Sequence, residues 1–389
     1  MNKKILNRKK ILIFGPLGDF GGRELEAGFI ANILSAKYDV AVLTSSSITH
    51  ESQLFDFNKN LNAFSINDLL YKTYYSLKIL SFFSYLRNKK KGNKSSYANN
   101  GIAKKYFNYN AKRLRIIREL LPKYDLLFIC AQLTTAFLDE VIQIAKENNI
   151  KVVFRTTGAI GFSDYDFISS VDCFIHHSVS NASRIQKDKN HTYVIIDQCA
   201  YNEKELLEIP LVQNRVSTFL TLGRLVKEKN FDIVIKAFQK IKEEGDILYI
   251  LGDGKELNNL KRIANNEKDV VFTGFIDNKD LHLYFSLVDC VIISHFYSET
   301  GPLTGIEAMA GSRLIISAKT GAMQDRLPYN RYWFNNSVDD LAMQMILIKA
   351  LALEEVLLLS QRIRTSYLED YSINRISEEY LKTIDNILK

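Results

Sequence analysis

Two glutamates separated by seven residues carry the first chemical signal in this sequence. Glu299 and Glu307 lie on either side of Gly301-Pro302. A carboxylate accepts hydrogen bonds from hydroxyl groups but repels a free phosphate. The pair therefore favours a ligand that is rich in hydroxyl groups.

The residues between the two glutamates predict an anion site. Residues 288–293 are apolar except for Asp289, which is typical of a buried strand, and a turn at Gly301-Pro302 follows. Pro302 suits the first position of a helix, where no backbone donor is needed. The N–H groups of Leu303 and Thr304 would then point out of the helix start and could bind an anion. An anion site beside hydroxyl acceptors fits a sugar joined to a nucleoside diphosphate.

Two cations follow an earlier predicted strand and could neutralise that diphosphate. Arg224 and Lys229 lie in the loop that begins at Gly223, after the apolar residues 218–222. Arginine offers a planar fork to phosphate oxygens, and lysine offers a point charge. Taken singly, each would be an ordinary surface cation. Their occurrence together with the two glutamates favours a shared phosphate site.

A glycine-rich loop, residues 15–22, follows the first predicted strand. Glycines such as Gly21 and Gly22 let the backbone approach a ligand closely. The loop lacks the full GxGxxG spacing. No acidic residue follows Leu43, where a dinucleotide-binding protein would carry one for the ribose. These two differences count against an NAD-dependent enzyme.

Short apolar strands alternate with amphipathic helices, which predicts an α/β fold of two doubly wound parallel sheets. The first half contains predicted strands at residues 10–14, 38–43, 125–130, 151–154, 172–175 and 193–196. The second half contains them at residues 218–222, 247–251, 270–273, 288–293 and 314–317. We expect domains over residues 1–205 and 206–365, a polar linker at 201–215 and a C-terminal helix over 366–389. The loops of the second half should gather beyond the carboxyl ends of its strands.

The composition of the 389 residues is that of a soluble globular protein, with 47% hydrophobic and 24% charged residues. The sequence contains no apolar run of about 20 residues and no signal-peptide pattern, so we expect a cytoplasmic protein. The four cysteines form no CxxC pair, which favours buried free thiols over disulfides or a zinc site. No metal site is predicted.

Residues 69–118 form a basic insertion without a single aspartate or glutamate, in a chain whose net charge is +7. Its lysines and arginines are interleaved with tyrosines and phenylalanines. This mixture fits a surface that lies on anionic lipid, or a nucleic-acid face. A solvated helical insertion is the plain alternative. We expect the lipid surface, which would place the protein peripherally on the inner face of the cell membrane.

Three motifs, each after a predicted strand, resemble those of the retaining glycosyltransferases of the GT-B architecture, specifically glycosyltransferase family 4 (glycosyl transferases group 1). The matching motifs are the E-x7-E pair Glu299 and Glu307, the G-R-L-x-x-x-K loop Gly223-Arg224-Leu225 with Lys229, and the G-G-x-E loop Gly21-Gly22-Arg23-Glu24. The similarity is strong over residues 219–326 and weak over 45–197. It implies two Rossmann-like domains that face each other across a cleft, with the last helix crossing back to the first domain.

The resemblance also implies a role for each matching residue. Arg224 and Lys229 would hold the donor diphosphate and neutralise it as it leaves, and Glu299 would contact the transferred sugar. Glu307 would bind the ribose. The other donor-binding positions would be Gly21, Gly22, Gly223, Gly274, Phe275, Ile276, Leu303 and Thr304. Because preorganised cations would stabilise the leaving group, no metal and no cofactor would be required.

The sequence departs from the family pattern at three places. Thr300-Gly301-Pro302 replaces the usual Gly-Phe-Gly, and Pro302 removes one donor from the phosphate cradle. Asp197-Gln198-Cys199 stands where an Asn-Gly turn usually precedes the linker. Thr156 or Thr157 occupies the place of a histidine that often follows a strand of the first domain.

We therefore expect a retaining glycosyltransferase that moves a sugar from a UDP-, GDP- or ADP-sugar to a hydroxyl of a glycan or lipid-linked acceptor, as in bacterial surface polysaccharide biosynthesis. Three alternatives stay open. They are a non-catalytic partner subunit of the same fold, a nucleotide-dependent oxidoreductase, and a nucleic-acid-binding protein that uses residues 69–118. The joint presence of both cations and both glutamates argues against the partner subunit.

Overall fold

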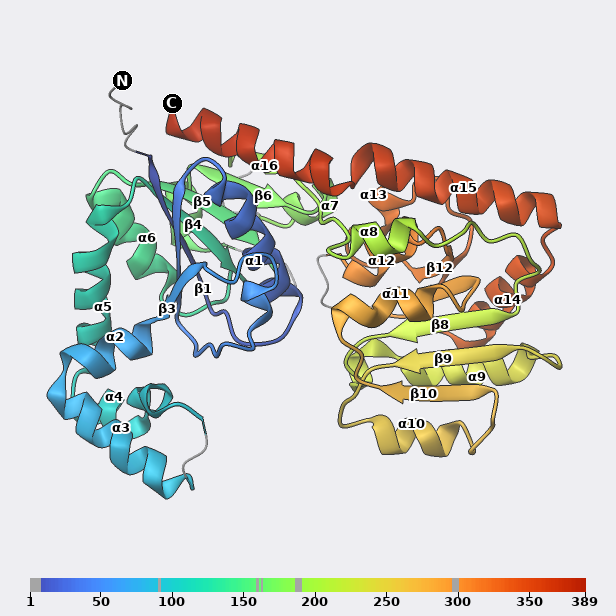
Figure 1. Cartoon of the computed structure of the whole chain (residues 1–389), viewed down its shortest axis with the longest axis horizontal. Helices are drawn as coiled ribbons and strands as arrows, with labels where there is room; N and C mark the ends of the chain where they lie inside the picture. Colours follow the sequence, from blue (N-terminus) through green and yellow to red (C-terminus); the bar gives the residue numbers. More distant parts are fainter. Residues whose placement is uncertain (1–7, 90–91, 159–160, 162–163, 186–190, 296–300) are drawn as a thin grey trace. The chain divides into compact units, whose positions relative to one another are not determined.

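A computed structural model gives the fold and describes residues 8–89, 92–158, 161, 164–185, 191–295 and 301–389 (Figure 1). The chain divides into two compact units. The first unit contains the residues up to His176 together with Ala182–Ile196 and Ser377–Lys389. The second contains His177–Asn181 and Asp197–Ile376. The end of the chain therefore belongs to the same unit as its beginning.

The first unit is built on a sheet of seven strands, all parallel, in the order β3-β2-β1-β4-β5-β6-β7. The strands are β1 (Lys10–Gly15), β2 (Asp39–Thr44), β3 (Asn62–Ser65), β4 (Leu126–Ala131), β5 (Lys151–Thr156), β6 (Cys173–His176) and β7 (Tyr193–Ile195). Six of these were predicted. The edge strand β3 was missed because its four residues, Asn-Ala-Phe-Ser, carry no run of apolar side chains.

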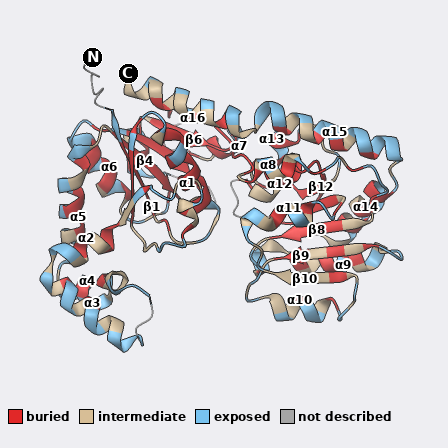
Figure 2. Cartoon of the chain, in the orientation of Figure 1, coloured by how far each residue is buried: buried red, intermediate tan, exposed pale blue. Residues whose placement is uncertain are grey.

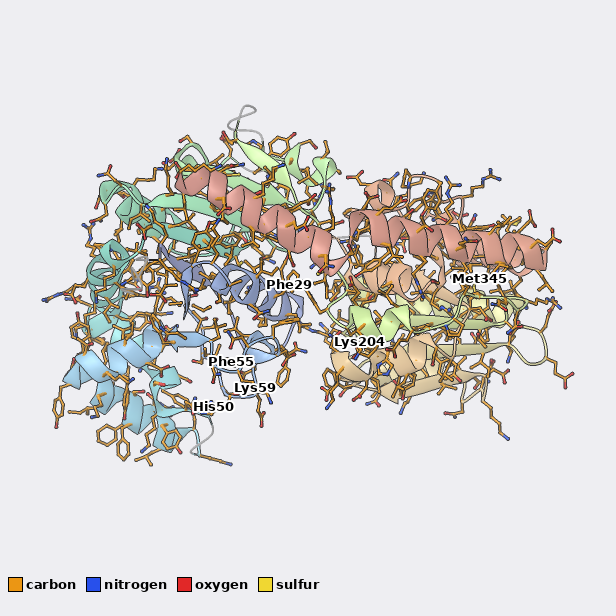
Figure 3. The ribbon with its side chains drawn as sticks, turned by 45° about the horizontal axis from the view of Figure 1, so that its top comes forward. Phe29, His50, Phe55, Lys59, Lys204 and Met345 are labelled. Carbon is orange, nitrogen blue, oxygen red and sulfur yellow. The ribbon has the colours of Figure 1, made fainter. Side chains whose placement is uncertain are left out.

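Helices connect these strands and also form the basic insertion. The helices are α1 (Gly22–Ser35), α2 (Ile66–Thr73), α3 (Tyr75–Arg87), α4 (Gly101–Tyr106), α5 (Tyr109–Leu120), α6 (Leu138–Glu147) and α7 (Val179–Ala182), and α16 (Ile373–Leu388) ends the chain. Short 3-10 turns are η1 (Gln53–Phe55), η2 (Lys94–Ala98), η3 (Leu121–Lys123) and η4 (Asp166–Ser170). Helix α1 is tied to the sheet by a buried ion pair, in which Arg155 Nη2 of β5 lies 2.6 Å from Glu26 Oε1. Figure 3 labels Phe29 on α1, whose ring meets that of Phe57 edge-on at 5.6 Å.

The second unit is built on six parallel strands in the order β10-β9-β8-β11-β12-β13. The strands are β8 (Thr218–Leu222), β9 (Ile247–Leu251), β10 (Val270–Gly274), β11 (Cys290–Ile293), β12 (Leu314–Ala318) and β13 (Trp333–Phe334). Its helices are α8 (Glu203–Leu207), α9 (Phe231–Ile241), α10 (Leu257–Ile263), α11 (Leu281–Phe285), α12 (Leu303–Ala310), α13 (Met323–Arg326), α14 (Val338–Lys349) and α15 (Leu353–Asp370), with 3-10 turns η5 (Lys227–Lys229) and η6 (Asn278–Asp280).

The central strands are buried on both faces in each unit, as Figure 2 shows by colour. Helices cover both faces of a parallel sheet, so its strands read as continuous apolar runs rather than alternating ones. In the second unit α9 and α14 pack on one face, where Phe238 and Met345 are fully buried. The predicted fold of two doubly wound parallel sheets is confirmed.

The segment 201–215 is not an exposed linker. It contains α8, and Leu206, Ile209 and Val212 are buried in the second unit. This segment resembles a polar linker in sequence because its buried residues occur singly among polar and charged ones. The four cysteines are free and buried, as expected. Among the described helices, none is both long and apolar enough to cross a bilayer.

Candidate functional site

The candidate site lies where the strand order of the second sheet reverses. Strands β8 and β11 are neighbours in the sheet, although β9 and β10 separate them in the sequence. Connections leave these two strands in opposite directions, which opens a crevice at their carboxyl ends where ligands of such sheets bind. The loop with Arg224 and Lys229 follows β8, and the stretch that leads to α12 follows β11.

Hydrogen bonds hold the exit of β8 against the exit of β11. Lys229 Nζ lies 3.2 Å from His295 Nδ1. Ser294 Oγ donates to the carbonyl of Lys229 at 2.7 Å, and Asn230 Nδ2 donates to the carbonyl of Ser294 at 3.3 Å. The Lys229 ammonium is therefore fixed beside the end of β11, on the same edge of the sheet as α12. Arg224 lies exposed in the same loop.

Burial keeps His295 neutral beside the Lys229 ammonium. Burial, with a smaller contribution from the Lys229 charge, lowers the pKa of His295 to about 3. A neutral imidazole can accept a hydrogen bond on Nδ1, whereas an imidazolium cannot. His295 thus positions the lysine without competing for an anion. It lies two residues after the end of the predicted strand at 288–293.

Glycines let the loops after β8 and β9 pass within contact distance of each other. The Gly252 backbone has φ +131°, and a Cβ there would lie 2.0 Å from the carbonyl oxygen of Gly223. A Cβ on Gly254 would lie 2.3 Å from the carbonyl oxygen of Leu225. The amide of Leu225 donates to the carbonyl of Asp253 at 2.9 Å. The cation loop is therefore held by backbone contacts that no other residue type would permit at these two positions.

Helix α12 presents unpaired amides at its start. It begins at Leu303, with Pro302 as the N-cap in an extended conformation, so Pro302 is not the first helical residue as predicted. The Gly305 amide donates to the carbonyl of Pro302 at 3.0 Å, whereas no described residue accepts from the amides of Leu303 or Thr304. Two free donors at a helix start form an anion site.

Glu307 is buried one turn inside α12. Its exposure is 2%, and burial raises the pKa of its carboxyl group to about 7. No described side chain or backbone amide donates a hydrogen bond to this carboxylate. A buried carboxylate without donors is unfavourable, so the position favours a ligand that brings its own hydroxyl donors.

The sequence-based reading missed a buried ion pair that anchors the start of α12. Arg326 donates to both carboxylate oxygens of Asp197 at 2.7 Å and to the carbonyl of Pro302 at 2.6 Å. Burial opposes ionisation of Asp197, but the Arg326 guanidinium outweighs it and holds the pKa of Asp197 below its usual value. The two residues are 129 positions apart, so local pattern gives no signal of the pair. The only sequence signal near the pair was that Asp197-Gln198-Cys199 departs from the family pattern.

The other predicted residues lie at the carboxyl edges of the two sheets. Gly274 ends β10 with φ +76°, Phe275 is exposed, and Ile276 packs against the core of the second unit. Gly21 and Gly22 lie in the first unit, at the start of α1. The Gly21 amide donates to Gln53 Oε1 at 2.8 Å, and the Gly18 amide donates to Glu24 Oε1 at 2.8 Å. Glu299 lies outside the described residues.

Comparison with known proteins supports the sequence resemblance. Residues 202–355 match the family described as glycosyl transferases group 1. An alpha-monoglucosyldiacylglycerol synthase of Streptococcus pneumoniae is 38% identical over 121 residues, which are 30% of this chain and 27% of the relative. A mannosylfructose-phosphate synthase of Agrobacterium fabrum is 29% identical over 126 residues, 29% of this chain and 28% of the relative. The matched segment thus spans less than a third of these curated relatives.

Solved structures are similar over nearly the whole chain. A glycosyltransferase of Rickettsia africae ESF-5 has a TM-score of 0.71 at 15% identity, covering 98% of this chain and 99% of that one. Anabaena Alr3699/HepE, solved in complex with UDP, has a TM-score of 0.70 at 14% identity, covering 97% and 100%. The fold is that of the GT-B glycosyltransferases, as predicted.

Proposed function

We propose that this protein is a retaining glycosyltransferase that uses a nucleoside-diphosphate sugar as donor. The observation that carries the proposal is the grouping at the switch point of the second sheet. There a fixed lysine follows β8, and two unpaired helix-start amides and a buried carboxyl without described donors belong to α12, which follows the neighbouring β11. Cations and amides suit a diphosphate, and the carboxylate suits a ribose.

The residues have separate tasks in the proposed reaction. Arg224, Lys229 and the amides of Leu303 and Thr304 would bind the diphosphate and stabilise the charge that develops when the bond from the anomeric carbon to phosphate oxygen breaks. Glu307 would accept hydrogen bonds from the ribose. The acceptor hydroxyl oxygen bonds to the anomeric carbon on the face that the diphosphate leaves, and the hydroxyl proton departs with the nucleoside diphosphate. These groups would act without a divalent metal.

Gly21 and Gly22 belong to the first unit, and for them we propose a close backbone approach to the donor phosphates. Gly274, Phe275 and Ile276 would lie beside the base. For Glu299, contact with hydroxyls of the transferred sugar remains a prediction from the sequence.

For the acceptor we propose a hydroxyl of a glycan or a lipid-linked sugar, in the assembly of a bacterial surface polysaccharide. The S. pneumoniae relative is named for a diacylglycerol glycolipid, which favours a lipid-linked acceptor. The A. fabrum relative is named for a small sugar phosphate, so the matched domain alone does not choose the acceptor. The first unit would supply acceptor contacts.

The test is donor binding and hydrolysis with a panel of UDP-, GDP- and ADP-sugars, with and without a chelator. We expect one donor class to raise the melting temperature and to release nucleoside diphosphate in the presence of chelator. Binding of none of these donors would refute the proposal. Donor binding without turnover on any acceptor, together with unchanged cellular function of a Glu299→Ala variant, would instead identify a non-catalytic partner subunit.

A further inference from the structure

Helix α3 of the basic insertion carries an apolar stripe that faces away from its own unit. The stripe consists of Tyr75, Ile79, Phe82, Phe83 and Leu86, at positions i, i+4, i+7, i+8 and i+11. Residues at this spacing share one face of a helix. All five are exposed, Tyr75 by 76% and Phe83 by 62%. In Figure 2 this helix is largely in the colour of exposed residues.

The orientation of α3 is fixed from its opposite face. Leu77 and Ser81 are fully buried, and Ser81 Oγ donates to the carbonyl of Lys94 in η2. The helix therefore packs on its unit through Leu77 and Ser81 and leaves two phenylalanines exposed on the other face, which is unusual for a surface helix. Such a large exposed apolar face marks an interaction surface.

Positive charge surrounds the stripe. Lys78 and Arg87 lie on its two flanks and are exposed. Lys94 Nζ lies 5.7 Å from the centre of the Phe82 ring. In neighbouring α4, exposed Ile102 and Tyr106 are accompanied by exposed Lys104 and Lys105. No acidic residue occurs from residue 69 to residue 118, so nothing in the insertion offsets this charge.

We infer that the exposed face of α3, extended by α4, docks on an anionic lipid bilayer. An apolar stripe with aromatic and aliphatic members, flanked by cations, is the pattern of a helix that lies in the membrane interface. Lysine and arginine side chains at the flanks reach anionic headgroups while the rings enter the acyl boundary. A second copy of the chain is disfavoured as the occupant, because two such faces would repel each other. A nucleic-acid face would place cations, rather than aliphatic side chains, along its centre.

The second unit offers a contrast within the same chain. Met343, Ile346 and Leu347 of α14 and Leu358 of α15 are also exposed. These helices carry Asp339 and Asp340, and Glu354 and Glu355, in their first turns. The acidic residues of α14 and α15 would repel an anionic surface. The inference for α3 uses neither the donor site nor the proposed activity.

The test is flotation of the full-length protein with vesicles of phosphatidylcholine alone or mixed with phosphatidylglycerol. We expect the protein to float with the anionic vesicles, less so at high salt, and only weakly with phosphatidylcholine. The double variant Phe82→Ser/Phe83→Ser should lower the vesicle–water partition constant by about tenfold or more. Lys104→Glu/Lys105→Glu should also lower it, and Leu358→Ser, the matched control, should not.

A second measurement reports insertion directly. The emission of a Phe83→Trp variant, after subtraction of the wild-type signal of Trp333, should shift to the blue with anionic vesicles and stay unchanged with neutral ones. Three results would overturn the inference: no vesicle binding, binding that the Phe82→Ser/Phe83→Ser variant retains, or a dimer that this variant dissociates. Salt-sensitive RNA retention without a blue shift on vesicles would point to nucleic acid instead, and would also overturn it. Since the substituted residues are exposed, circular dichroism should find every variant folded.

Discussion

At the scale of single residues, the Glu307 carboxyl group combines burial with the absence of any described donor. Evolved structures rarely leave such a group unsatisfied unless a ligand completes it. The Lys229 ammonium differs, because hydrogen bonds around it fix its place before any ligand arrives. The Glu307 carboxyl group thus has hydrogen-bonding capacity left for a ligand, whereas the Lys229 ammonium is already positioned by its neighbours.

Replacing Glu307 by glutamine should stabilise the ligand-free protein at alkaline pH. Burial raises the pKa of Glu307 to about 7 in the folded chain, above the value of 4.5 for an exposed glutamate. The folded state therefore binds the proton more tightly, and stability is lost as pH rises from about 4.5 to about 7. Urea unfolding of wild type and Glu307→Gln should differ by up to about 3 kcal/mol at pH 8 and by much less at pH 5. An equal difference at both pH values would contradict the assignment.

Replacing Lys229 by methionine should weaken binding of the nucleoside diphosphate. Loss of one charge-assisted contact corresponds to about 1.5–3 kcal/mol, or roughly a tenfold to hundredfold increase in Kd. Calorimetry with UDP, GDP and ADP measures it. Lys227→Met is the matched control, because Lys227 is exposed in the same 3-10 turn. If both variants bind equally well, Lys229 has no part in the site.

The position of Arg224 and Lys229 at one edge of the sheet could be predicted from sequence, because their loop follows an apolar strand and a parallel sheet brings such loops together. The site roles of the glycines and of Glu307 stay predictions, and Glu299 lies outside the described residues. Asp197 and Arg326 could not be predicted in this way. Their pairing depends on where α13 lies in three dimensions, and the residues between them give no periodic signal. His295 could not be predicted as a site residue either, because its contact with Lys229 depends on β8 and β11 being neighbours in the sheet.

At the scale of elements, the start of α12 is the part that most needs a fixed position. Its N-cap carbonyl, that of Pro302, is bound by Arg326, which Asp197 orients through two hydrogen bonds. A shift of the helix start would move the two free amides and Glu307 together. The ion pair is therefore a positioning device for this helix, and its fully buried setting makes its removal costly.

Replacing Arg326 by methionine should destabilise the protein by about 3–5 kcal/mol, because Asp197 would be left charged and buried. The double variant Asp197→Asn/Arg326→Met should recover part of this loss. Chemical denaturation of both variants measures it. The pKa of Asp197 is lowered in the folded chain, so the pair contributes stability above the ordinary aspartate pKa, and the contribution is lost as pH falls. A single variant as stable as wild type would rule out a structural role for the pair.

Replacing Gly252 by alanine should disrupt the loop that carries Arg224. The new Cβ would meet the Gly223 carbonyl oxygen, and the backbone there has a left-handed φ. A destabilisation of about 1–3 kcal/mol, accompanied by weaker nucleotide binding, is expected. The matched substitution is Gly245→Ala, which also has positive φ but has no atom within 4 Å of its Cβ. Equal nucleotide affinity of the two variants would argue against the loop contact.

At the scale of the whole molecule, both sheets could be predicted because parallel strands buried on two faces form continuous apolar runs. The elements that were missed, β3 and β13, are short edge strands with few apolar residues. The prediction of a linker at 201–215 was wrong for a related reason, because single buried residues in a polar segment give no recognisable hydrophobic pattern. The final helix packs on the first unit, where Tyr380 lies with its ring 6.4 Å from that of Phe128.

Replacing Tyr380 by alanine should destabilise the first unit by about 3 kcal/mol or more, because the side chain is fully buried. Hydrogen exchange should become faster in β4 and remain unchanged in β8. Lys382→Ala is the control, since that residue is exposed on the same helix. Faster exchange in both sheets would mean that the two units unfold together.

The composition of the first unit from both ends of the chain sets an order of events on the ribosome. Its seven strands leave the exit tunnel long before Ser377–Lys389, which complete its hydrophobic surface. While the second unit is being synthesised, the apolar surface of the first sheet that Tyr380 and Ile384 later cover stays exposed. Residues 377–389 therefore cover the apolar surface of a sheet that is synthesised much earlier, and a product truncated before them carries an open apolar site that chaperones and proteases can recognise.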